Sequence, residues 1–296
     1  MTFLEQAKYK YHTANVLEKL IAINVIVFVL MYVFQAIAFL FKFQENFILD
    51  WLVFSKDPED LLFKPWSIVT YAFLHSGILH LLGNMLILYY AGTYFITYFT
   101  QKKILNFYFL GAIVGALVYL LSYNFFPAFA GTGRSYLLGA SAGVMAVLVG
   151  IATKVPNLGI RLLFIGTIKL WYIAAFFVVL DIIRIPTENA GGFLAHLGGS
   201  FFGYFYVKQL DKGNDIGKWW ENFMDWFVNL FTSRKEKPFR NVHRNKTQTS
   251  SKTPTADYKA INQKKIDTIL DKISKSGYDS LSKDEKDFLF KSGKED

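Results

Sequence analysis

The sequence predicts an all-α membrane protein, built as a six-transmembrane helical bundle with an amphipathic helix and a small helical tail behind it. Two observations lead to this fold class. Of the 296 residues, 53% are hydrophobic and only 19% are charged, whereas soluble domains carry about 25% charged residues. Six apolar stretches of helical length also follow one another before residue 210. We therefore expect an integral membrane protein.

A helix that crosses a bilayer needs about 20 apolar residues, and this length places the spans. The first apolar stretch is too long for the core of a signal peptide and no small-residue cleavage motif follows it, so we expect it to stay in the chain. The fifth span starts near Lys169, because a charge at the bilayer centre costs about 2.5 kcal/mol or more, and 158–166 then forms an interfacial segment. The expected spans are 17–41, 78–99, 104–123, 138–153, 169–183 and 192–207.

The loops between the spans differ in their basic residues, which indicates the orientation of the bundle. Lysines precede the first span, join the second to the third, and follow the fourth and the sixth, whereas Arg134 and Arg184 stand alone in short loops on the opposite side. The positive-inside rule then places both termini in the cytoplasm. The long loop 41–66 holds an apolar run, and we expect it to be a re-entrant or interfacial element.

Composition divides the chain into parts. After the sixth span, aromatic residues recur at helical spacing, which predicts an amphipathic helix on the inner membrane surface. A polar, basic, Ser/Thr-rich stretch follows and is typical of disorder. The expected parts are a cytoplasmic segment (1–16), the six-span domain (17–210), the amphipathic helix (211–231), a disordered linker (232–257) and a two-helix cytoplasmic module (258–296).

About half of the net charge of +9 comes from the end of the chain, where nineteen of the 32 Lys and Arg lie after residue 207 beside fourteen Asp and Glu. Mixed signs of this kind suit an anionic membrane surface, and we expect no nucleic acid as a partner. In the last module Gly277 should end the first helix, and Ser282 with Glu285 forms a capping box for the second. This module could bind a partner that the sequence does not identify.

Polar side chains inside membrane spans are costly, and they usually mark function. His80 and Asn84 lie four residues apart on one face of the second span, Ser141 opens the fourth, and His196 lies near the start of the sixth. All three spans enter the membrane from the same side. At 1.5 Å per residue, these groups should lie at one depth, about 5 to 10 Å below the outer surface.

This set of side chains suits nucleophilic catalysis. A serine hydroxyl attacks a carbonyl when a base takes its proton, and histidine is the usual base. The resulting oxyanion needs hydrogen-bond donors, which Asn84, His80 and amides at the start of the fourth helix could supply. Small residues would let the fourth and sixth helices approach closely; these residues are Gly139, Gly143, Gly199 and Gly203.

Other interpretations of these residues are possible. Ser141 and His196, or His80 and Asn84, could simply form hydrogen bonds between helices. The G-x-S-x-G string also occurs in soluble hydrolases, but there it follows a strand, and we expect none here. With no cysteine in the chain and no metal-ligand spacing among the histidines, we expect no metal site. His75 is interpreted as an interfacial residue.

Taken together, the motifs resemble those of the rhomboid family of intramembrane serine proteases, over roughly residues 17–210. The matching features are His80-x-x-x-Asn84, Gly139-x-Ser141 and Ala195-His196-x-x-Gly199-x-x-x-Gly203. The resemblance implies a rhomboid-type bundle in which Ser141 is the nucleophile and His196 the base, with His80, Asn84 and the Ser141 amide as the oxyanion hole. It also implies a dyad without a catalytic acid, so we interpret Asp181 and Glu188 as helix-end or loop carboxylates.

The resemblance further implies no cofactor, and single-span transmembrane proteins as substrates, which enter laterally past the first outer loop and the fifth span. The charged tail resembles those of some bacterial rhomboids, which implies a bacterial cytoplasmic membrane. Two positions depart from patterns in the family. The first outer loop has Trp51 and Trp66 but no Trp-Arg pair, and Met145 replaces a tyrosine that stacks on the catalytic histidine in some members. His196 must then be oriented by another contact.

Two other function classes can be compared with the protease. Some rhomboid-like proteins bind membrane clients for quality control without cutting them. These typically lack the serine or the histidine, whereas this chain has both Ser141 and His196. A transporter would show inverted repeats and ionisable groups at the middle of the membrane, and neither is found.

Overall fold

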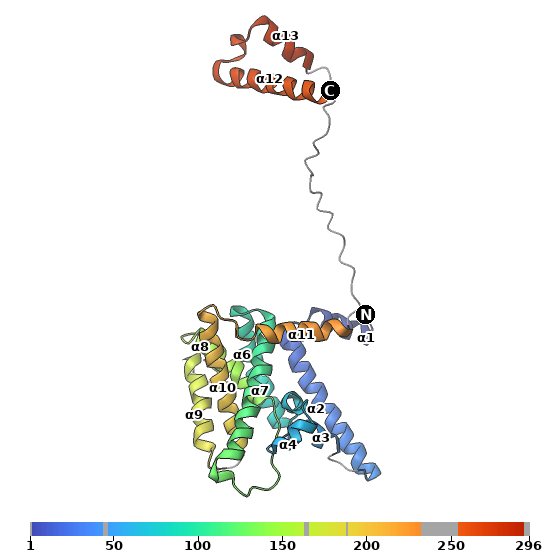
Figure 1. The fold of residues 1–296 in the computed structure, drawn as a ribbon, viewed down its shortest axis with the longest axis vertical. Helices are drawn as coiled ribbons and strands as arrows, with labels where there is room; N and C mark the ends of the chain where they lie inside the picture. Colours follow the sequence, from blue (N-terminus) through green and yellow to red (C-terminus); the bar gives the residue numbers. More distant parts are fainter. Residues whose placement is uncertain (1, 44–46, 163–165, 188, 232–253, 293–296) are drawn as a thin grey trace. The chain divides into compact units, whose positions relative to one another are not determined.

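The computed structural model describes residues 2–43, 47–162, 166–187, 189–231 and 254–292. It divides into two compact units, Met1–Ser233 and Arg234–Asp296, and both are mainly helical (Figure 1). Within the first unit the helices are α1 (Phe3–Thr13), α2 (Val16–Phe41), α3 (Phe47–Leu52), α4 (Pro58–Phe63), α5 (Ser67–Thr70), α6 (Ile78–Tyr98), α7 (Gln101–Phe125), α8 (Ser141–Lys154), α9 (Leu170–Arg184), α10 (Ala190–Asp211) and α11 (Lys218–Phe231).

Three of these helices, α2, α6 and α7, are long and apolar enough to cross a membrane, counting only the described residues. The shorter α8 is also apolar. Together with α9 and α10, they coincide within a few residues with the six predicted stretches. The start of α9 at Leu170, directly after Lys169, agrees with the boundary predicted from the cost of a buried charge.

Capping boxes define the first two helix starts. The Asn15 side chain accepts a hydrogen bond from the Glu18 amide at 2.9 Å, and the Glu18 side chain accepts one from the Asn15 amide at 2.8 Å. This capping box starts α2 at Val16. Thr2 and Glu5 form the same motif at the start of α1. Over 1–16 the sequence predicts only a cytoplasmic segment, and the Thr2-x-x-Glu5 spacing is the signal for the helix found there.

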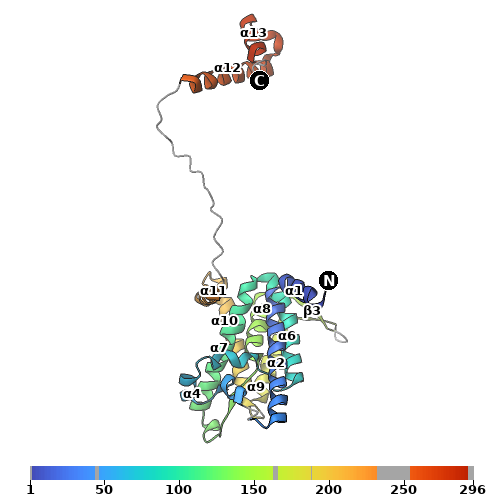
Figure 2. The ribbon, with the colours of Figure 1, turned by 90° about the vertical axis from the view of Figure 1, so that its right-hand side faces the viewer.

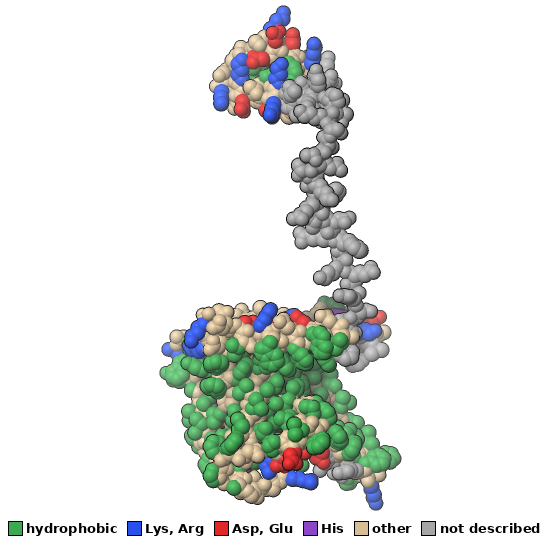
Figure 3. Space-filling model, viewed as in Figure 1, with side chains coloured by type: hydrophobic (Ala, Val, Ile, Leu, Met, Phe, Trp, Pro, Cys, Tyr) green, Lys and Arg blue, Asp and Glu red, His purple; other side chains and the backbone are tan. Residues whose placement is uncertain are grey.

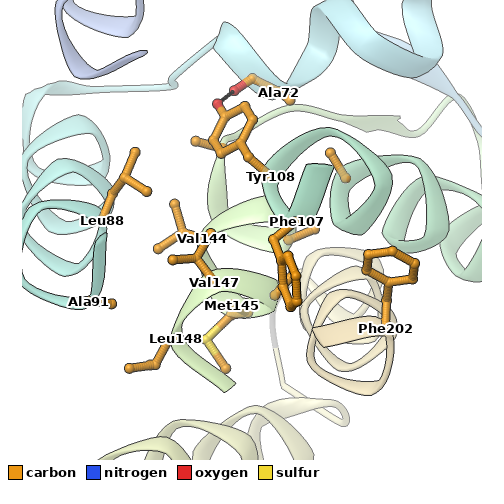
Figure 4. Packing of buried hydrophobic residues seen from close by; sticks show 14 of the residues in the cluster. Ala72, Leu88, Ala91, Phe107, Tyr108, Val144, Met145, Val147, Leu148 and Phe202 are labelled. Carbon is orange, nitrogen blue, oxygen red and sulfur yellow. Dashed lines mark hydrogen bonds between the residues drawn. The ribbon is translucent and has the colours of Figure 1, made fainter. Parts of the chain in front are cut away.

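The core of the first unit is centred on α8, which packs against α6, α7 and α10. Figure 4 shows Val144, Val147 and Leu148 of α8 between Leu88 of α6 and Phe107 of α7. Ten of the 14 residues of α8 are themselves buried. A helix that is apolar on all sides is stable only when it is enclosed, which explains why α8 lies inside the bundle.

Hydrophobic side chains cover the middle of this unit, and charged side chains gather at its two ends (Figure 3). At one end of the bundle, where α1 also lies, α11 crosses the ends of the long helices (Figures 1 and 2). Lys103 of α7 holds it there through ion pairs with Asp215 and, at 2.6 Å, with Glu221. The aromatic residues Trp219 and Trp226 of α11 are exposed, which agrees with the predicted amphipathic helix.

The expectation of an all-α chain is wrong in two places. β1 (Phe54–Ser55) pairs antiparallel with β2 (Tyr136–Leu137), and β3 (Gly159–Leu162) pairs with β4 (Gly166–Lys169). The second pair lies in the predicted interfacial segment. Paired strands satisfy backbone polar groups that a lipid-exposed irregular loop would leave unpaired, so the expected interfacial segment contains hydrogen-bonded strands.

The loop between α2 and α6 is anchored without the Trp-Arg pair of some rhomboids. Trp51 and Trp66 stack at a ring-centroid distance of 5.9 Å, and the Trp66 indole donates to the Trp51 carbonyl at 2.8 Å. Lys64 lies over the Trp51 ring at 5.4 Å, and Thr70 donates to the Leu52 carbonyl. The turn Tyr71–Phe73 then leads from this loop into α6.

The second unit contains α12 (Pro254–Ser276), a short turn Tyr278–Ser280 and α13 (Lys283–Ser292). Gly277 has a φ of 76° and ends α12, and Ser282 and Glu285 form the predicted capping box. Lys272 pairs with Glu285 at 2.9 Å, which lowers the pKa of this carboxyl to about 2. Most of the predicted linker, 232–253, lies outside the described residues.

Candidate active site

Ser141 and His196 meet at the end of the bundle opposite α11. Ser141 is the first residue of α8, and His196 lies in the second turn of α10. The Oγ of Ser141 is 2.6 Å from Nε2 of His196. This is a hydrogen bond between a hydroxyl nucleophile and a base, which is the geometry that serine activation needs.

The other nitrogen of His196 contacts a carboxylate. Nδ1 lies 3.0 Å from Oδ1 of Asp181, which is buried in the last turn of α9. Asp181 is thus a helix-end carboxylate, as expected, but it also contacts His196, which the sequence does not predict. The signal that could have identified it is an acidic residue inside an apolar helix. Glu188, the other acid considered, lies outside the described residues.

His196 is oriented by Asp181 and by Phe193, whose ring is perpendicular to it at 6.0 Å. These contacts replace the stacked tyrosine of some rhomboids. Met145 stands at that position and is buried in the core.

His80 and Asn84 lie on α6 across the same cavity from Ser141. Ser76 holds the Nδ1 side of His80 at 3.1 Å, and Asn84 donates to the His80 carbonyl at 3.0 Å. Gly139 has a φ of 131°, and a Cβ built on it would lie 3.0 Å from Nε2 of His80. Glycine at this position therefore allows His80 to approach Ser141, since any larger residue would contact the imidazole.

The four glycines named in the sequence have different contacts. A Cβ on Gly199 would lie 2.0 Å from the Ala142 carbonyl oxygen, and one on Gly203 would lie 2.3 Å from that of Ala146. These two allow α10 to approach α8. Gly143 instead faces the Tyr108 backbone of α7, and Gly139 precedes α8 and serves His80, so neither lies between the fourth and sixth helices as expected.

The cavity over Ser141 has a volume of about 260 Å³. It is lined by residues of α6, α8, α9 and α10. The first backbone hydrogen bond of α8 runs from the Val144 amide to the Ala140 carbonyl. The Ser141 amide therefore precedes the hydrogen-bond ladder of this helix. A carbonyl group placed in the cavity would meet a nucleophile, a base and several donors.

Two further expectations concern neighbouring residues. His75, expected at the interface, is buried with its ring 5.1 Å from that of His80. Burial, together with the charge of His80, lowers the pKa of His75 to about 4, so it is neutral at pH 7.

A two-residue strand, Tyr136–Leu137, does precede Ser141, where none was expected. Within the described part of the chain this strand pairs with Phe54–Ser55 in a two-stranded sheet, and a larger central sheet like that of a soluble hydrolase is not seen there.

Comparison with known proteins finds two families. The Rhomboid domain matches residues 63–210, which is half of the chain, and these residues include every side chain of the candidate site. A family of unknown function, DUF6576, matches residues 256–292, the two-helix unit.

Several relatives share the membrane domain. RHOMBOID-like protein 12, mitochondrial, from Arabidopsis thaliana is 28% identical over 50% of this chain and 47% of its own length. Presenilin-associated rhomboid-like protein A, mitochondrial, from Danio rerio is 31% identical over 46% of this chain and 35% of its own length. Rhomboid-like protease 3 from Toxoplasma gondii is 29% identical over 53% of this chain and 56% of its own length. The chain thus spans about half or less of the length of these relatives. With the Rhomboid domain matched across half its residues, this integral membrane protein belongs to the rhomboid family.

Proposed function

We propose that the chain is a serine-type endopeptidase that hydrolyses peptide bonds of transmembrane proteins within a six-span bundle. The observation that carries this proposal is the 2.6 Å hydrogen bond between Ser141 and His196. It lies in a cavity of the membrane domain, and the family includes a relative named as a protease. A serine and a histidine that only fastened two helices would not need a cavity beside them.

The proposed reaction proceeds in two steps. Ser141 Oγ attacks the carbonyl carbon while its proton passes to Nε2 of His196, and the histidine then protonates the departing amine. The acyl group remains on Ser141 as an ester. Water next attacks this ester, giving its proton to His196, and the serine leaves with that proton. Both steps pass through an oxyanion, which the Ser141 amide, Asn84 and His80 are placed to stabilise.

Replacing Asn84 by Ala is expected to lower kcat by about 10²- to 10³-fold, because it removes one oxyanion donor. Protein stability should change little, since the Asn84 amide bonds only the His80 carbonyl of its own helix among the interactions described. Cleavage kinetics and thermal unfolding of the purified variant measure the two effects. Thr93→Ala is a matched control, because Thr93 bonds the Tyr89 carbonyl in the same way two turns farther along α6. Equal kcat in both variants would exclude Asn84 from the oxyanion hole.

The substrates we propose are single-span membrane proteins that reach Ser141 between α6 and α9. Leu79 of α6 and Phe177 of α9 line the catalytic cavity. A second, apolar cavity of about 330 Å³ continues between the same two helices, with Ile87 and Phe177 shared. A substrate helix could occupy this lipid-facing path with its unwound end at Ser141.

The proposed orientation has Ser141 near the outer membrane face and both termini in the cytoplasm. The ends of α8 support it, since Ser141 starts this helix and Lys154 ends it beside Asp211, at 2.7 Å. Lys102 and Lys103 lie at the α11 end as well. The proposed compartment is a bacterial cytoplasmic membrane, which rests on the likeness of the charged tail to those of some bacterial rhomboids.

Removing residues 254–296 is expected to leave kcat and KM in detergent within about twofold of the full chain, because parts of a protein that share no interaction contribute independently. Every candidate catalytic group lies in the first compact unit, Met1–Ser233. Cleavage assays on the two proteins at matched folded concentration test this. Loss of cleavage by a truncated protein with an unchanged melting temperature would assign the tail a direct part in catalysis.

The function is tested by reconstituting the protein in lipid vesicles with a panel of labelled single-span substrates. The protein should cleave at least one of them, while Ser141→Ala and His196→Ala should cleave none. If no substrate is cut but a fluorophosphonate labels Ser141, the nucleophile is competent and the panel lacks the right sequence. If neither cleavage nor labelling occurs, the alternative of a client-binding, quality-control protein becomes the better account.

A further inference from the structure

The contact between Asp181 and His196 goes beyond a dyad. Asp181 is 7% exposed, and its Oδ1 lies 3.0 Å from Nδ1 of His196. Among the described residues, its second oxygen is buried and has no hydrogen-bond partner. A carboxylate that fastened α9 to the bundle would use both oxygens, whereas this one has the imidazole as its described partner. The arrangement therefore suggests a role toward His196.

The two hydrogen bonds of His196 are compatible with only two tautomers. If Asp181 is ionised, Nδ1–H donates to its carboxylate and Nε2 is free to accept the Ser141 proton. If Asp181 is protonated, it donates to Nδ1, and Nε2–H then donates to Ser141. Only the first state leaves a base facing the nucleophile.

A basic side chain, Arg184, lines the same cavity as Asp181. The titratable or charged side chains that line this cavity are His80, Asp181, Arg184 and His196. Arg184 lies one turn beyond Asp181 on α9, with its guanidinium 4.9 Å from the centre of the Phe193 ring. Arg184 therefore supplies a positive charge to the cavity that holds the Asp181 carboxylate. No other carboxylate lines the cavity among the described residues.

We propose that Asp181 is a positioning residue for His196: its ionised carboxylate selects the tautomer with the proton on Nδ1 and stabilises the imidazolium that forms when Ser141 is deprotonated. This inference rests on the proposed peptidase function. The proton from Ser141 stays on Nε2 until the leaving amine takes it, and the Nδ1 proton stays on Nδ1 throughout. Asp181 itself neither gains nor loses a proton.

The test replaces Asp181 by Asn, which keeps the shape of the side chain and removes its charge. Asp211→Asn is the matched control, because Asp211 pairs with Lys154 at the opposite end of α10. Asp181→Asn is expected to lower kcat about 100-fold, within the range of general-base catalysis, and to leave KM within about twofold. Fluorophosphonate labelling of Ser141 should slow by a similar factor. Cleavage by Asp181→Asn within about threefold of the control would overturn the inference.

A second measurement needs no variant at Asp181 and stays decisive if that variant does not fold. In protein labelled with ¹⁵N at its five histidines, the signal lost in His196→Ala identifies His196. We expect Nδ1 of His196 to carry the proton and Nε2 to be bare at neutral pH. A proton on Nε2 with a bare Nδ1 would overturn the inference. If the unmodified protein neither cleaves nor labels, the peptidase function fails, whereas the tautomer still reports on Asp181.

Discussion

Ser141→Ala and His196→Ala should each lower kcat at least about 1,000-fold, and the double variant should be no slower than either one, because groups that act as one unit are not additive. The two side chains share a single proton across their 2.6 Å contact. Removing one partner therefore removes the function of the other. Kinetics of all three variants on one cleaved substrate, at matched folded concentration, measure the effect.

Ser200→Ala is the matched control for this series. Ser200 is buried in α10, one turn beyond His196. Cleavage by this variant should stay within about threefold of the unmodified protein, as expected for a site independent of the reacting groups. Retained cleavage in Ser141→Ala, or a double variant far slower than both single variants, would contradict the dyad.

Gly199→Ala should cause the second large effect, on both stability and cleavage. The new methyl group would lie 2.0 Å from the Ala142 carbonyl oxygen, so α10 and α8 must move apart. Overpacking of this kind costs about 1–3 kcal/mol, and the displaced residue is next to the nucleophile. Thermal unfolding should begin at a lower temperature, and kcat should fall at least about 10-fold, because a misplacement of about 1 Å can cost 10²-fold.

Gly83→Ala is the stability control for this substitution. Gly83 is also a helical glycine, in α6, but a Cβ there would have no atom within 4 Å. Its melting temperature should be unchanged or slightly higher, since Ala is favoured over Gly in helices by about 1 kcal/mol. Equal melting temperatures for the Gly199 and Gly83 variants would contradict the close packing of α8 against α10.

Much of the fold could be predicted because the bilayer imposes length and polarity on each segment. Lys169 defined the start of α9, and the Ser282–Glu285 capping box defined that of α13, since both signals are local. The β1–β2 pair could not be predicted in this way. Phe54 pairs with Leu137, far away in sequence, and two-residue strands leave no periodic pattern.

In the candidate site, too, residues with a local sequence signal could be predicted, whereas a contact that depends on helix packing could not. Ser141, His196, His80 and Asn84 could be selected because each is a polar residue in an apolar helix. Asp181 meets the same criterion, but its place near the end of an apolar helix also suits a carboxylate outside the site. Which side of α9 faces His196 depends on how α9 packs against α10, and a helix with many apolar residues on its lipid side does not reveal this in its sequence. Its last-turn position also suited a solvated carboxylate.

The most direct test of the central claim is to identify the residue that reacts with a fluorophosphonate. The protein in lipid vesicles is treated with the probe, digested, and the modified peptide is read by tandem mass spectrometry. We expect the adduct on Ser141, lost in His196→Ala although that variant keeps the serine. An adduct on another serine, or labelling of Ser141 at the same rate without His196, would contradict a nucleophile activated by that histidine.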